Sequence, residues 1–174
     1  MRKLIIAIGI GVVTCSLLRA HEEPVAKNPS PEFDQVRKLA GKWTGTQVGK
    51  PDDKMAGPLT TEFKVTSAGS AVEETLGPGT PHEMVDMYVD EGGKLAMTHY
   101  CAMGNQPHMV LSKANAKSIT LDMDKAPGVD AAKDPHMHTL ILEMPDANHL
   151  TERWTSHKDG KAEETVVFNF TRTK

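Results

Sequence analysis

Beyond Trp43, apolar and polar residues alternate with a period of two, which is the pattern of β-strands that bury one face. Residues 119–123, 140–144 and 166–170 are clear examples. Glycine, proline, asparagine and aspartate separate the alternating runs, as expected for turns. The pattern predicts about ten strands, near residues 43–49, 60–66, 71–76, 82–89, 94–103, 106–112, 117–123, 137–144, 149–156 and 163–171.

The connections between these strands are short, which favours an antiparallel meander. An open sheet of this size would leave two unpaired edges, and closure into a barrel removes both. We therefore predict an all-β fold, an antiparallel up-and-down β-barrel of about ten strands. The longest connection, near Asp124 to Pro135, either lies over a barrel mouth or is an ordinary surface loop.

A short helix is expected before the first strand. Ser30 is a good N-cap, Pro31 suits the first helical position, and Gly41 can end the helix. Apolar residues recur between them at helical spacing, namely Phe33, Val36, Leu39 and Ala40.

The first twenty residues have the features of a secretion signal. Arg2 and Lys3 precede an apolar run from Leu4 to Leu18, and Ala20 is a small residue at a possible cleavage point. The run is shorter than the roughly 20 residues that a membrane-spanning helix needs, although an uncleaved N-terminal anchor is the alternative. We expect a signal peptide at 1–20, a flexible lead-in at 21–30 and one barrel domain at 31–174, with export to the periplasm or beyond the cell.

Two cysteines bear on this picture. Residues 12–15, Val-Val-Thr-Cys, resemble the lipobox in which the cysteine is lipidated after cleavage, so Cys15 is a candidate lipid anchor. Thr14 stands where such signals have glycine, alanine or serine. Cleavage after Ala20 would leave Cys101 as the only cysteine, so no internal disulfide is expected.

The charge of the chain excludes some partners. Residues 1–20 carry three basic residues and no acidic ones, so their removal changes the formal net charge from −3 to −6. No cluster of lysine and arginine stands out along the chain. Nucleic acid and anionic membrane surfaces are therefore not expected partners, and no membrane span is expected.

Several short stretches resemble a known group of proteins. Gly41-Lys42-Trp43 opens the first strand after a short helix, as the Gly-x-Trp signature does in lipocalins and the wider calycin superfamily. Residues 81–85 (PHEMV), 97–102 (MTHYCA) and 104–107 (GNQP) are similar to an uncharacterised group of exported bacterial lipocalin-like domains. The resemblance covers most of residues 33–172 and implies the fold, but the group has no settled activity. Ten strands also resemble the barrels of fatty-acid-binding proteins and of nitrobindin-like domains, which hold haem through a histidine; no matching ligand position is identified here.

Strand register predicts a group of polar side chains around Cys101. If Gly104-Asn105 is a two-residue hairpin loop, Cys101 lies opposite His108 and shares a face with His99. A two-residue turn at Glu91-Gly92 or Gly92-Gly93 adds further residues to that face. The face then holds His82, Met84, Asp86, Tyr88, Leu95, Met97, His99, Cys101, Met103, Gln106, His108 and Val110. We expect it to point into the barrel, although the opposite face is more uniformly apolar near residues 85–89.

Three interpretations of this face remain open. The histidines either satisfy one another in the filled, semi-polar core of a structural or interaction domain, or line a pocket for a small, partly hydrophobic ligand. The third interpretation is binding of copper through His99, Cys101 and His108, or of haem through the same face. The ligand-binding residues would be His82, Met84, Tyr88, Met97, His99, Cys101 and His108. The sequence does not identify a cofactor, and no catalytic motif is present, so it favours a binding protein over an enzyme.

Other candidates are weaker. Alternation places His136 and His138 on one face and Met137 on the other, which is typical of a solvated strand start. Glu73 and Glu74 are expected to be solvated on opposite faces. Trp43 and Trp154 are expected to fill or cap the core. Neither the ligand nor the oligomeric state follows from the sequence.

Overall fold

The structure is a computed structural model that describes residues 29–48 and 58–174. The expected signal peptide at 1–20, the candidate lipid anchor Cys15 and nearly all of the lead-in lie outside the described residues. One helix, α1 (Pro31–Arg37), and a 3₁₀ turn, η1 (Ser67–Gly69), accompany ten strands. The strands are β1 (Gly41–Val48), β2 (Pro58–Thr66), β3 (Ala71–Leu76), β4 (Met84–Asp90), β5 (Leu95–Tyr100), β6 (His108–Asn115), β7 (Ser118–Lys125), β8 (His136–Asp146), β9 (His149–Lys158) and β10 (Lys161–Arg172).

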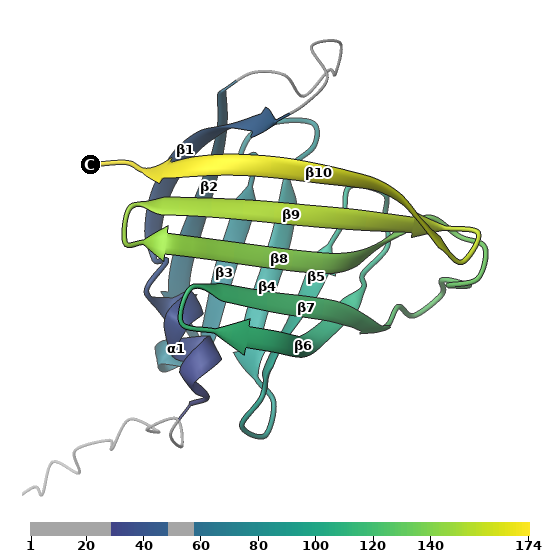
Figure 1. Cartoon of the computed structure of the whole chain (residues 1–174), viewed down its shortest axis with the longest axis horizontal. Coiled ribbons are helices and arrows are strands. Elements are labelled where there is room, and N and C mark those ends of the chain that lie inside the picture. Colours follow the sequence, from purple (N-terminus) through teal and green to yellow (C-terminus); the bar gives the residue numbers. More distant parts are fainter. Residues whose placement is uncertain (1–28, 49–57) are drawn as a thin grey trace, which may run out of the picture.

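The strands form one closed antiparallel barrel (Figure 1). Each strand pairs with the next along the chain, and β10 returns to pair with β1, for example through Trp43 and Arg172. Closure satisfies the hydrogen-bonding groups of both outer strands, so the barrel has no free edge. The predicted all-β meander with a short N-terminal helix is confirmed. Among the described residues, no helix has the length and apolar content needed to cross a lipid bilayer.

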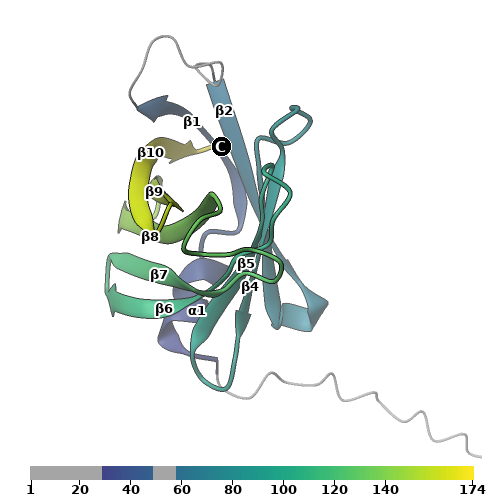
Figure 2. The same cartoon turned by 90° about the vertical axis from the view of Figure 1, so that its right-hand side faces the viewer.

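Helix α1 closes one end of the barrel, as Figures 1 and 2 show from the side and along the barrel. The Ser30 hydroxyl caps the helix by accepting a hydrogen bond from the amide of Phe33. Phe33 and Val36 are buried in the core, and burial of each such side chain stabilises the fold by about 2 kcal/mol. Trp43 is fully buried at the same end, where its indole N–H donates to the Leu39 carbonyl at 2.9 Å.

Arg172 fastens the last strand to this closed end. Its guanidinium lies 4.1 Å from the centre of the Trp43 ring, within cation–π range. The same group donates to the carbonyl oxygens of Ala40 at 2.7 Å and Lys38 at 2.9 Å, just beyond the helix. These contacts give donors to the carbonyl groups of the turn that connects α1 to β1.

The face predicted to point inward on β4 and β5 does so. Asp86 pairs with His99 and Tyr88 with Met97, and all four side chains are buried. Glu91 donates its amide to the Lys94 carbonyl across the Gly92-Gly93 turn, so the second of the two predicted turn positions is the observed one.

The predicted register between β5 and β6 is wrong. Met97 pairs with Met109 and Thr98 with His108, so Cys101 does not lie opposite His108. The loop is longer than two residues, because the amide of Cys101 bonds the Asn105 carbonyl and the amide of Gly104 bonds the Cys101 carbonyl.

Pro107 explains the longer loop. Proline has no N–H to donate to a strand ladder, and the Pro107 carbonyl instead accepts from the His99 amide at 2.9 Å. Regular pairing starts only after it. Because the shift is an odd number of residues, β6 turns over, so that Met109 faces the interior and His108 faces outward.

Candidate functional site

A cavity of about 130 Å³ lies in the barrel interior, away from the end that α1 closes. An empty apolar cavity of similar size, about 150 Å³, is enough to hold benzene. The walls are apolar apart from His99 and Gln47. Of the seven predicted ligand-binding residues, Met84 and His99 line the cavity. The lining residues are Gln47, Leu76, Met84, His99, Met137, Trp154, Val166 and Phe168.

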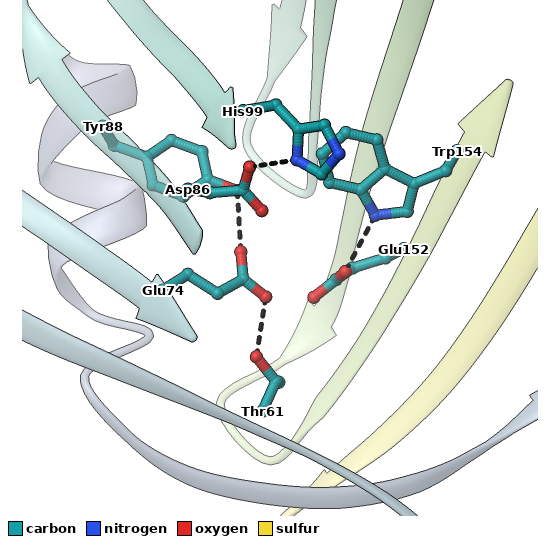
Figure 3. A network of polar contacts seen from close by, with 7 residues as sticks. All are labelled: Thr61, Glu74, Asp86, Tyr88, His99, Glu152 and Trp154. Atoms are coloured by element: carbon teal, nitrogen blue, oxygen red, sulfur yellow. Dashed lines mark hydrogen bonds and ion pairs between the residues drawn. The ribbon is translucent and has the colours of Figure 1, made fainter. Parts of the chain in front are cut away.

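His99 is the polar anchor of this cavity. Its Nδ1 donates to the Asp86 carboxylate at 2.6 Å, and both side chains are almost completely buried (Figure 3). The imidazole also lies against the Trp154 indole, with 4.5 Å between the ring centres. Its second nitrogen, Nε2, is buried and has no oxygen or nitrogen partner, while the Cys101 thiol interacts with the ring.

The surroundings of His99 keep its ring protonated. Burial by itself lowers the pKa of His99, but the charge and hydrogen bond of Asp86 outweigh it, and the Cys101 thiol acts in the same direction as Asp86. The net result raises the pKa of His99 to about 10. At neutral pH the ring is therefore an imidazolium paired with Asp86, and its Nε2–H remains available to an acceptor in the cavity.

Two further carboxyl groups lie beside this pair (Figure 3). Glu74 accepts hydrogen bonds from the Tyr88 hydroxyl at 2.9 Å and the Thr61 hydroxyl at 2.8 Å. Glu152 accepts from the Trp154 indole N–H at 3.1 Å. Both glutamates are fully buried, and five strands of the barrel contribute to the group.

Burial shifts both glutamates toward their neutral forms. Desolvation raises the pKa of Glu74 well above its usual value, and the charges of Glu152 and Asp86 raise it further. Desolvation also raises the pKa of Glu152, to about 7. The same burial, with the charge of Glu74, raises the pKa of Tyr88, so its hydroxyl stays a donor. The negative charge of Asp86 is thus offset by the His99 ring, and burial favours the neutral form of the neighbouring Glu74.

The other predicted ligand-binding residues divide into three groups. Tyr88 and Met97 are fully buried in the interior, and Cys101 is buried beside His99. His82 is exposed in the turn before β4 and does not join the group. His108 lies on the outer face, where its ring contacts the Thr98 hydroxyl at 3.3 Å and the Glu91 carboxylate at 3.4 Å.

These positions do not fit either metal hypothesis at this face. His108 is on the opposite side of the sheet from His99 and Cys101, so the expected copper ligands do not converge. Haem does not fit the interior, because a porphyrin is much larger than a cavity of about 130 Å³.

Sequence reasoning missed the two buried glutamates. We expected Glu74 to be solvated, but it shares the inward face of β3 with Val72 and Leu76. Glu152 lies between Leu150 and Trp154 on the inward face of β9. The period-two pattern contained this signal, since each glutamate occupies an apolar position of its strand. The two tryptophans are buried as expected.

The comparisons with known proteins support the fold. No protein-family model matches the chain, and no curated protein matches it. The crystal structure of Rv2717c from M. tuberculosis is similar, with a TM-score of 0.58 and 14% identity, over 84% of this chain and 100% of that one. A protein of unknown function from the DUF3598 family of Nostoc punctiforme has a TM-score of 0.53 and 15% identity, over 88% of this chain.

The chain spans about half of the Nostoc protein, 53% of its length. At these identities the likeness concerns the fold alone, and it is consistent with a calycin-like barrel. Membership of an exported lipocalin-like group stays a prediction.

Proposed function

We propose that the barrel binds a small, largely apolar molecule that carries one neutral hydrogen-bond acceptor, such as a carbonyl group. The observation that carries the proposal is Nε2 of His99, a buried nitrogen without an oxygen or nitrogen partner at a cavity whose other lining residues are apolar except for Gln47. A buried donor without a partner costs about 1–3 kcal/mol. A ligand that accepts this hydrogen bond recovers that free energy.

The walls favour a compact apolar body. Met84 and Met137 have flexible side chains that adapt to irregular shapes, while Trp154 and Phe168 offer flat aromatic surfaces. The volume of about 130 Å³ suits a single ring or a short branched chain.

The charges favour a neutral ligand over an anion. Asp86 already neutralises the His99 ring, so a ligand carboxylate would add an uncompensated negative charge to a mostly apolar cavity. Glu152, which begins to ionise near neutral pH, would repel such an anion further. A carbonyl or ether oxygen accepts the hydrogen bond without this cost.

Three probes of equal heavy-atom number test the proposal: acetophenone, isopropylbenzene and benzoate. Their affinities for the full chain at neutral pH are measured by calorimetry and by perturbation of NMR signals. We expect acetophenone to bind most tightly, isopropylbenzene about tenfold more weakly through loss of one hydrogen bond, and benzoate most weakly.

His99→Gln keeps a donor of similar size but removes the charge. We expect this variant to have a smaller difference in affinity between acetophenone and isopropylbenzene. His108→Gln is the matched control, because this histidine lies outside the barrel. Equal binding of the three probes, or loss of selectivity in the His108 variant alone, contradicts the proposal. Native mass spectrometry of protein purified under mild conditions then searches for the natural ligand.

The same proposal includes export of the barrel. The charged and apolar pattern of residues 1–20 supports a removable signal, and the lipobox-like Cys15 supports a lipid-anchored alternative. The intact mass of the protein recovered from the periplasmic fraction distinguishes cleavage after Ala20 from lipidation at Cys15. Recovery of the full-length chain in the cytoplasm contradicts export.

A further inference from the structure

A second group of histidines lies on the outside of the barrel, at the end opposite α1. Strand β8 begins and β9 ends there (Figure 1). His136 and His138 come from β8, and His157 comes from β9, where it pairs directly with His136. One ring nitrogen from each of the three lies within 4.8 Å of the others.

A β-bulge brings the three rings together. The pairing of β8 with β9 shifts between Met137 and Thr139, so His138 has no partner in the ladder. Met137 points inward and lines the cavity, whereas His138 and Thr139 both follow it on the outer side. A bulge commonly re-aims a side chain in this way. Simple alternation predicted the shared face of His136 and His138, but not their approach to His157.

A backbone hydrogen bond orients the ring of His136. It is fully buried, and its Nδ1 donates to the backbone carbonyl of Asp134 at 2.8 Å. That hydrogen bond leaves the lone pair on Nε2, and an outer-shell carbonyl is a common partner of metal-binding histidines. Nε2 lies 3.4 Å from Nδ1 of His138. Two nitrogens bound to zinc in tetrahedral geometry, at about 2.05 Å each, are separated by about 3.3 Å.

The charges nearby also suit a cation. Asp122 accepts a hydrogen bond from Thr139 at 2.7 Å, and its negative charge acts on both His138 and His157. This carboxylate places a negative charge next to the histidine rings, which favours the binding of a cation there.

We propose that His136, His138 and His157 bind a divalent transition-metal ion of the zinc class on the outer face of the barrel. Imidazole suits zinc, copper and nickel, and three protein ligands leave a fourth position for water. His138 and His157 are stacked, with ring centres 3.8 Å apart and an angle of 10° between the rings. Both are only partly buried, and they must turn out of this stack when the ion binds. The site does not depend on the proposed ligand of the interior.

The test uses full-length, metal-stripped protein titrated with Zn²⁺, and with Co²⁺ as a spectroscopic probe. We expect one ion per chain, and absorption bands of Co²⁺ typical of nitrogen ligands in tetrahedral geometry. His138→Gln and His157→Gln are expected to weaken binding by at least about tenfold. Neither residue is fully buried, so these variants are expected to fold, which a thermal melt checks.

Two controls make the result specific. His149→Gln removes an exposed histidine that is paired with Asp146 at the other end of β9, and should leave binding unchanged. His21→Ala, measured in protein cleaved after Ala20, removes a residue that can chelate a metal at the new N-terminus. Zinc binding that is absent, that survives both His138→Gln and His157→Gln, or that disappears in either control overturns the proposal.

Discussion

His99 in the barrel interior and two histidines on the outer face, His138 and His157, have pKa shifts in opposite directions. His99 is almost completely buried, yet its pKa is raised to about 10, because Asp86 outweighs the cost of burial. His138 and His157 are only partly buried, yet the pKa of each is lowered. Burial lowers both, and the neighbouring imidazoles lower them further, while Asp122 opposes the shift without reversing it.

The difference shows that the neighbouring charged groups, more than the depth of burial, decide what a histidine can bind. An imidazolium has no lone pair and can only donate, so His99 suits a hydrogen-bond acceptor. A neutral imidazole keeps a lone pair, so the outer group suits a metal ion. Met137 connects the two sites, because it lines the cavity while its neighbours on either side belong to the outer group.

The largest expected effect comes from removing the carboxylate of the inner site. Asp86→Asn should destabilise the fold by about 3 kcal/mol, because it leaves a buried imidazole without its counter-charge. With that charge gone, burial dominates and the pKa of His99 falls. Denaturant unfolding measures the first effect, and NMR titration measures the second.

Asp122→Asn is the matched change at the outer site. It should lower the free energy of unfolding by less than about 1 kcal/mol. Asp122 is only partly buried, and the asparagine amide oxygen can still accept the hydrogen bond from Thr139. Similar losses of stability for the two variants would mean that the inner ion pair has no special role.

The pH dependence of stability is the next largest effect. The folded-state pKa values of Glu152, about 7, and His99, about 10, both exceed their unfolded values. The folded chain therefore holds these protons more tightly. The Glu152 contribution is complete below about pH 4.5 and is lost as pH rises through 7. The His99 contribution is complete below about pH 6.5 and is lost toward pH 10.

We therefore expect the free energy of unfolding to fall between about pH 5 and pH 10, by up to about 1.4 kcal/mol per pH unit for each proton. Denaturant unfolding at a series of pH values measures the slope. Glu152→Gln, which mimics the neutral form, should flatten the lower part of the curve. A stability that rises over this range is incompatible with the assigned pKa shifts.

Met137→Ala addresses the strand that the two sites share. It should lower stability by about 1–2 kcal/mol, since the side chain is partly buried and its loss enlarges the cavity. Acetophenone affinity should change, while zinc affinity should stay within about twofold because the three rings point the other way. Calorimetry with each probe gives both values, and a parallel loss of zinc binding would show that the sites are not independent.

The smallest effect concerns the loop that turns His108 away from His99. Gly104 has a φ of +81°, which only glycine adopts freely. Gly104→Ala should cost about 1 kcal/mol of stability, with no change of ligand preference. Gly92→Ala, at a φ of +67° in the other turn, is the control and should cost a similar amount. An unchanged melting temperature for Gly104→Ala would indicate a different loop conformation.

The sequence predicted the strands well and the site only in part. Alternation identified ten strands, and it placed Asp86, Tyr88, Met97 and His99 inside, because each strand carries its own inward pattern. The position of His108 depended on the length of one loop, which local pattern does not determine. The approach of His157 to His138 depended on a bulge, and bulges leave little trace in alternation.

The protonation of the histidines in metal-free protein tests the central claim most directly. Side-chain nitrogen NMR, followed from pH 5 to pH 11 with His99→Gln and His138→Gln for assignment, reports the state of each ring. The account predicts that His99 remains doubly protonated at pH 8 and titrates near 10, while His138 and His157 lose their protons below the usual value for histidine. A His99 ring that is neutral at pH 8, or outer rings that stay charged there, would contradict it.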